Sequence, residues 1–194
     1  MVRLDSRPRR APTMQRPTTP LRAGFSLIEL VIAISILSIV AGIVAPRVSQ
    51  FSEKARVTTA ESDLKAMVKV LDTIREDMGV YPRDVSRGVD PGMASPTRVP
   101  SSRRTLWEGP YLDSWPAETP WKGLYDYEYW NYPDFDFDGT PGNEIVMSVR
   151  GGNMGASTLQ ALDAKMDDGD GSTGIVRHNG TNWLGMYVGE GPRW

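Results

Sequence analysis

The first half of the chain contains one long apolar run with very few polar positions inside it. Between Phe25 and Ala45 the sequence has twenty-one residues, of which only Glu29 is charged. A helix of this length rises about 30 Å, which matches the hydrocarbon core of a bilayer. We therefore predict a transmembrane helix over residues 25–45. An unpaired carboxylate in lipid costs at least about 2.5 kcal/mol, and nothing nearby in the chain supplies a partner for Glu29.

After Pro46 the pattern becomes amphipathic but keeps a helical period. Apolar residues recur at a spacing of three and four with charged residues between them, as on a helix with one buried stripe. Gly79 and then Pro82 follow, which is typical of a helix end. The pattern predicts one helix over residues 25–78, with a kink or local unwinding at Pro46. The predicted stripe consists of Leu64, Met67, Val68, Leu71, Ile74 and Met78.

Residues 79–194 predict a small folded domain built on a sheet. Tyrosines alternate with acidic residues over 125–129, the pattern of a half-buried strand. Two further short strands are predicted over 144–149 and 183–188. The many aromatic residues between 107 and 137 are expected to form its core, and His178 is expected in a turn. The predicted fold class is α+β, with a long N-terminal helix packed on a small antiparallel sheet.

Charge is distributed unevenly along the chain. The formal net charge is −2, but residues 1–24 carry six arginines and one acid, which leaves 16 basic and 23 acidic residues in the remainder. A basic segment before an apolar run stays on the cytoplasmic side of a membrane. The acidic remainder argues against nucleic-acid binding. Met14 is an alternative start that would shorten the basic segment.

Several chemistries are excluded by composition. The chain has no cysteine and one histidine, so disulfides, thiolate metal sites and multi-histidine sites are ruled out. No phosphate-binding loop, Ser/His/Asp set or paired-carboxylate site stands out. We therefore do not expect an enzyme.

The stretch Gly24-Phe25-Ser26-Leu27-Ile28-Glu29-Leu30 resembles the processing motif of type IV prepilins and pseudopilins. That motif has a glycine before the cut, phenylalanine as the new N-terminus and an acid four residues later; Pro46 also lies where the family places a helix-breaking proline. The chain further resembles the major pseudopilin of type II secretion systems. The resemblance covers about residues 22–150 and includes the stretches 77–82, 107–112, 115–116 and 119–123.

This resemblance implies a type IV pilin-like fold, a processing step and an assembly. The leader 1–24 would be removed by a prepilin peptidase, which would also methylate the amine of Phe25. In a filament of identical subunits, Glu29 would meet the amine of Phe25 of its neighbour. Minor pseudopilins and an inner-membrane assembly platform would be further partners. The protein would cross a bacterial inner membrane once, with residues 79–194 in the periplasm, and would form a pseudopilus that drives protein export.

Three other interpretations remain open. A type IV pilin would form surface fibres for adhesion or motility, although the absence of cysteine favours a pseudopilin because many pilins carry a disulfide. A membrane-anchored periplasmic binding protein could carry a pilin-like signal. A plain single-pass anchor would let Glu29 extend to the lipid headgroups.

A first candidate calcium site lies in the acidic stretch Asp134, Asp136 and Asp138. Carboxylates at alternate positions before Gly139 match the first half of an EF-hand loop. The match then fails, because Glu144 falls one place short of the position that needs a bidentate glutamate.

A second candidate calcium site comprises Asp167, Asp168 and Asp170, which have the right chemistry without the spacing. In the pseudopilins that the chain resembles, calcium pins the C-terminal loop, but the usual ligand run is not reproduced over 148–153. The alternative is that Asp-Gly pairs simply make turns.

Overall fold

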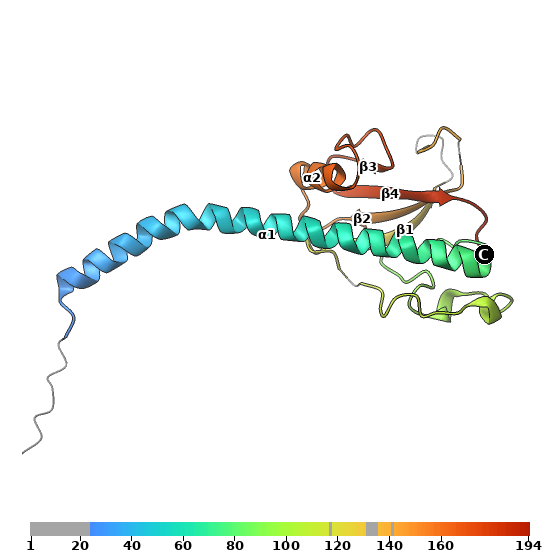
Figure 1. Ribbon diagram of the computed structural model, residues 1–194, viewed down its shortest axis with the longest axis horizontal. Helices are drawn as coiled ribbons and strands as arrows, with labels where there is room; N and C mark the ends of the chain where they lie inside the picture. The colour runs from blue at the N-terminus through green and yellow to red at the C-terminus, as the bar shows by residue number, and fades with distance from the viewer. Residues whose placement is uncertain (1–23, 117, 131–135, 141) are drawn as a thin grey trace, which may run out of the picture. The chain divides into compact units, whose positions relative to one another are not determined.

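The computed structural model describes residues 24–116, 118–130, 136–140 and 142–194, with Trp130 described by its backbone alone (Figure 1). The predicted leader therefore lies outside the described residues except for Gly24. The chain divides into two compact units, Met1–Ala45 and Pro46–Trp194. Each unit is described by itself.

Helix α1, Leu27–Met78, is the longest element of the chain. It contains one segment that is long and apolar enough to cross a membrane, and no part of that segment is buried. Pro46 lies inside α1, and the helix is not interrupted there. The local unwinding expected at Pro46 is therefore absent, because the loss of one backbone donor does not end a helix that hydrogen bonds propagate on both sides.

The sheet has four antiparallel strands in the order β1-β2-β4-β3. They are β1 Leu124–Trp130, β2 Glu144–Arg150, β3 Val176–His178 and β4 Trp183–Glu190. Three of these strands were predicted, whereas β3 was not. The prediction that His178 lies in a turn is wrong, since it ends β3; a strand of three residues is too short to show an alternating pattern.

The main core lies between α1 and the inner face of the sheet. Alternation along the strands places Tyr125 and Tyr127 of β1 and Met147 of β2 on this face, where all three are fully buried. The strands run alongside the C-terminal part of α1 (Figure 1). The buried stripe of α1 begins earlier than predicted and leaves Val68 only partly buried: it comprises Val57, Ala60, Leu64, Met67, Leu71, Ile74 and Met78. The predicted α+β class, a long helix on a small antiparallel sheet, is confirmed.

Helix α2, Ala156–Met166, was missed by the sequence analysis. It has eleven residues and begins after Gly155, which offers no side-chain cap, so the usual start signal is missing. Leu159 and Leu162 are fully buried in the main core. Hydrogen bonds also join α2 to α1, because the hydroxyl of Thr158 donates to Glu53 at 2.6 Å and Lys165 donates to Glu61 at 2.6 Å.

The long connection between α1 and β1 contains two short 3₁₀ helices, η1 Pro96–Arg98 and η2 Arg104–Leu106. The carboxylate of Asp90 organises this connection by accepting from the backbone N–H groups of residues 92–95. The end of the chain returns to the end of α1. The N–H of Tyr81 donates to the carbonyl of Pro192, and the N–H of Trp194 donates to the carbonyl of Tyr81.

Replacing Leu71 by alanine should destabilise the unit Pro46–Trp194 without changing its fold. Leu71 is fully buried in the main core, and a Leu→Ala change at such a site costs about 2–5 kcal/mol. Denaturant unfolding of the purified protein would measure this loss. Asp72→Ala, at the exposed neighbouring position, is the matched control and should change the unfolding free energy by less than about 0.5 kcal/mol.

Candidate functional site

The start of α1 is fully open to its surroundings. Phe25 is 86% exposed, and apart from Gly24 and its neighbours in the chain no atom of the described residues lies within 4 Å of the place where a side chain on Gly24 would begin. The apolar side chains that follow along the helix are also exposed. An uncovered apolar surface of this extent requires a lipid or protein environment.

Glu29 has a local partner that the sequence analysis did not expect. Its Oε2 accepts a hydrogen bond from the backbone N–H of Ser26 at 3.3 Å. Because α1 begins at Leu27, Ser26 occupies the N-cap position and Glu29 the third helical position, as in a capping box. The expectation that nothing nearby partners Glu29 is therefore wrong. The Ser-x-x-Glu spacing was the signal that could have identified this contact.

This contact leaves the negative charge of Glu29 without a counter-ion. Its donor is a neutral backbone group, and among the described residues no basic side chain lies within 4 Å of this carboxylate. The partial positive charge of the helix start offers some stabilisation. A full positive charge close to Glu29 has to come from outside the part of the chain that the structure describes.

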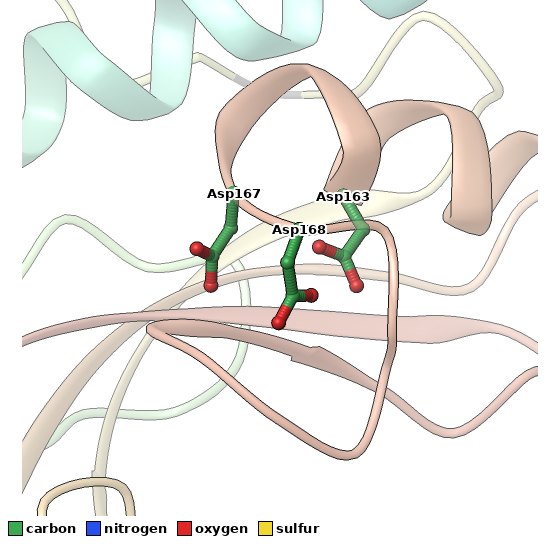
Figure 2. A group of neighbouring side chains, drawn as sticks. All are labelled: Asp163, Asp167 and Asp168. Atoms are coloured by element: carbon green, nitrogen blue, oxygen red, sulfur yellow. The ribbon is translucent and has the colours of Figure 1, made fainter.

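A second candidate site lies in the turn that follows α2. Asp163, Asp167 and Asp168 each offer a carboxylate oxygen, and these oxygens all lie within 4.8 Å of one another. Figure 2 shows the three side chains pointing to the same side of the turn. Asp163 and Asp167 are four residues apart, so a helical turn places them on one face. Oxygen ligands at this spacing suit a hard cation such as Ca²⁺.

Burial and hydrogen bonding distinguish these carboxylates. Asp163 is fully buried, and its Oδ2 has no hydrogen-bond partner; burial raises its pKa. The nearest basic group is Nε2 of His178 at 3.6 Å. Asp168, by contrast, accepts from the N–H of Asp170 and the hydroxyl of Thr173, and these bonds lower its pKa. Asp167 accepts from the backbone N–H groups of Ile175 and Val176. The buried Oδ2 of Asp163, which accepts no hydrogen bond from the described residues and has only His178 near it as a basic group, fits a cation site.

The predicted metal ligands of this turn are only partly brought together. Asp167 and Asp168 lie in the group, whereas Asp170 accepts from Ser172 and does not belong to it. Asp163 was missed because α2 was not predicted, so its relation to Asp167 was not visible.

The other predicted ligands lie in the connection between β1 and β2. Asp134 falls outside the described residues. Asp136 accepts from the N–H groups of Asp138 and Gly139, and Asp138 accepts from the N–H of Thr140. These bonds are those of acidic turns.

A third acidic group lines a cavity of about 300 Å³ beside β1. Asp126 is buried there, with Arg150 Nε 3.7 Å away, and Arg150 Nη2 lies 2.7 Å from Glu128. Burial, followed by repulsion from Glu128, raises the pKa of Asp126 to about 6. Burial likewise raises the pKa of Asp84 on the same cavity. Glu128 is held by donors, among them the indole N–H of Trp183 at 3.0 Å.

Comparison with known proteins gives two matching family models. Residues 20–45 match the prokaryotic N-terminal methylation motif. Residues 47–139 match the type II secretion system protein G family. No solved structure matches the chain.

Curated relatives lie in the same family. The chain is 34% identical to the type II secretion system core protein G of Pseudomonas aeruginosa over 106 residues, which cover 55% of this chain and 72% of that protein. It is 34% identical to the protein of the same name from Aeromonas hydrophila, covering 54% of this chain and 71% of that protein. The protein of this name from Vibrio cholerae is 32% identical, with 55% and 70% covered.

Asp126→Asn should stabilise the protein at pH 7 by at most about 3 kcal/mol, since the carboxylate is disfavoured by roughly two pKa units. Asp126 has a higher pKa in the folded protein than its ordinary value of 3.8, so the folded state takes up a proton as the pH falls from about 6 towards 3.8. The free energy of unfolding of the wild type therefore rises over this range. The variant should lose this pH dependence. Denaturant unfolding between pH 7 and pH 4 measures it, with the exposed Asp72→Asn as control. A variant that is less stable than the wild type at pH 7 would refute the assignment.

Proposed function

The chain belongs to the type II secretion system protein G family, and we propose that it is a structural subunit of the type II secretion pseudopilus. It assembles through α1 into a periplasmic filament that drives protein export. The family is one of structural pseudopilins, so the chain is not an enzyme. The observation that carries the proposal is the pairing of an N-terminal methylation motif with an exposed apolar helix that holds one unneutralised carboxylate.

Processing occurs at the Gly24–Phe25 bond in this proposal. A prepilin peptidase cuts after Gly24 and methylates the new amine of Phe25. The match to the methylation motif over residues 20–45 supports this step. The exposure of Phe25 and the open space around Gly24 leave the bond accessible to an enzyme.

Assembly neutralises Glu29 in this proposal. The charge of Glu29 meets the cationic amine of Phe25 from the neighbouring subunit, in a weakly screened environment where opposite charges attract strongly. The hydrogen bond from Ser26 supports the role by orienting Glu29 at the start of the helix. Because the pair forms in one register only, it selects how subunits stack. Pro46, at the end of the apolar segment, also takes part in assembly.

The protein is anchored to a membrane by the apolar part of α1. We infer a single pass through a bacterial inner membrane, with the basic residues 1–24 on the cytoplasmic side and the unit Pro46–Trp194 in the periplasm. The partners that follow are further copies of the chain, minor pseudopilins, the prepilin peptidase and an inner-membrane assembly platform.

We also propose that the turn after α2 holds a calcium ion through Asp163, Asp167 and Asp168. The support is their spacing of 4.8 Å or less and the buried Oδ2 of Asp163, which accepts no hydrogen bond from the described residues and has Nε2 of His178 at 3.6 Å. Calcium takes six to eight oxygens, so backbone carbonyls and water must complete the shell. When bound, the ion neutralises these carboxylates and fixes the connection from α2 to β3.

Glu29→Gln should abolish filament assembly while the subunit stays in the membrane. Glutamine keeps an acceptor for the N–H of Ser26 but removes the charge, so the variant separates pairing from capping. Electron microscopy of membranes from a secreting strain would count filaments, and export of a secreted protein would be assayed in parallel.

The control for this experiment is Ser35→Ala, which changes another exposed position of the same segment and should leave assembly intact. Mass spectrometry of both variants should show the same N-terminus, cut before Phe25. Normal filaments from Glu29→Gln would contradict the charge-pair role. Fibres on the cell surface with normal export would favour a type IV pilin instead.

Asp168→Asn should reduce the calcium-induced rise in Tm. A ligand that binds only the folded state stabilises it by about 2.7 kcal/mol at a hundredfold excess over Kd, and the variant removes one ligand charge. Thermal unfolding with calcium or with chelator measures the shift. Asp72→Asn, which is exposed and outside the turn, should retain the full shift; equal shifts in both variants would count against this site.

A further inference from the structure

Two glutamates face each other at the end of the sheet where β2 begins and β4 ends. Glu144 pairs with Glu190 across the antiparallel ladder. The register shifts between Ile145 and Val146 so that Val146 pairs with Tyr187. This β-bulge places Glu190 on the same outer face as Tyr187, opposite the face that packs on α1. Directly opposed like charges destabilise a sheet, so the pair requires a compensating group.

The two glutamates have oxygens that are buried and without a partner. Glu144 is 0% exposed; within the described part of the chain its Oε2 has no hydrogen-bond partner, and its Oε1 accepts one long bond of 3.4 Å from the N–H of Gly142. Oε1 of Glu190 is likewise buried and unpartnered. Among the residues that the structure describes, no basic side chain lies within 4 Å of either carboxylate.

The connection between β1 and β2 brings further carboxylates to this end of the sheet. Phe137 stacks on Tyr187 with ring centroids 5.6 Å apart, and the hydroxyl of Tyr187 donates to Oδ2 of Asp138 at 3.0 Å. The stacking and the hydrogen bond place Asp138 on the face of the sheet that carries Tyr187, Glu144 and Glu190.

Arg177, a basic residue that contacts this connection, forms no ion pair with these acids among the described residues. The guanidinium of Arg177 donates to the backbone carbonyls of Asp136 and Phe137, at 2.6 Å and 3.4 Å, and lies over the ring of Phe137. It holds the connection against the sheet through the backbone. The negative charge of the carboxylates is left for another cation.

We propose that Glu144, Glu190 and Asp138 bind a hard divalent cation at the end of the sheet, with Asp136 beside them. The carboxylate of Glu144 is fully buried, so a small ion reaches it more readily than a lysine or arginine side chain does. Ligands drawn from two strands and a turn favour Ca²⁺, which accepts irregular shells, over Mg²⁺, which demands a near-ideal octahedron. This site is separate from the turn after α2 and does not rest on the filament function.

Binding must draw these ligands together. The described residues contain three ligand oxygens within 4.8 Å of one another in the group after α2, and the acids at the sheet end are arranged more widely. A cation at the sheet end would therefore draw Asp138 towards Glu144 and Glu190 as it binds. Backbone amide signals of Gly139 and Thr140 in NMR spectra should shift on addition of Ca²⁺.

The test uses the full chain in detergent, with Asp168→Asn as the background so that the turn after α2 is weakened. Ca²⁺ at a hundredfold excess over Kd should raise the Tm of this background by roughly 5–10 °C relative to chelator. Adding Glu144→Gln or Glu190→Gln should abolish the rise. Each should also raise the Tm in chelator, because it removes one of two opposed charges. The same change at an exposed site, Glu76→Gln, should leave both values unchanged.

The outcomes separate the two calcium proposals. A calcium-dependent rise that survives both Glu144→Gln and Glu190→Gln would overturn the sheet-end site, as would a background that does not respond to Ca²⁺. A rise that disappears with these glutamine variants supports the sheet-end site even if Asp168→Asn alone changes nothing. Filament assembly through Glu29 is measured independently of either result.

Discussion

The structure of the unit Pro46–Trp194 depends on the burial of one stripe of α1 against the inner face of the sheet. Leu64, Leu71 and Ile74 are fully buried there against strand residues such as Tyr125 and Met147. Burying such side chains supplies about 1.5–3 kcal/mol each, more than a surface ion pair contributes. Polar groups on the flanks of the same helix then fix its neighbours: the Tyr125 hydroxyl donates to Asp63 at 2.5 Å, and the Trp121 indole donates to Glu53 at 2.9 Å.

The same helix has opposite requirements along its length. From Val57 onward one stripe of the helix is buried within the chain, whereas the apolar residues up to Phe51 are exposed and Glu29 has no counter-ion among the described residues. The start of α1 lacks contacts that lipid and neighbouring subunits can provide, whereas the unit Pro46–Trp194 has its own core. A subunit of this kind is suited to assembly. The capping contact with Ser26 gives Glu29 a structural role in the single subunit as well.

The buried carboxylates that accept few hydrogen bonds lie mostly beyond the part of the chain that matches the family model. The match to the protein G family ends at residue 139, and α2, β3 and β4 all follow it. Both groups with unpartnered buried carboxylate oxygens use residues from this region, Asp163 in one and Glu144 with Glu190 in the other. Buried carboxylates without partners are costly. A bound cation would compensate the charge of these carboxylates at each of the two proposed sites.

The sequence by itself determined the elements with long, regular patterns: the apolar segment, the amphipathic stripe and the alternating strands, because each pattern repeats over enough residues to define its period. It also contained the processing motif around Gly24 and Phe25. Only the tertiary structure decided the rest. Helix α2 and strand β3 are short and owe their form to packing, and the bulge that aligns Glu144 with Glu190 changes which face a side chain occupies. Residues far apart in the chain, such as Glu144 and Glu190, come together through strand register, which no local pattern of charges can encode.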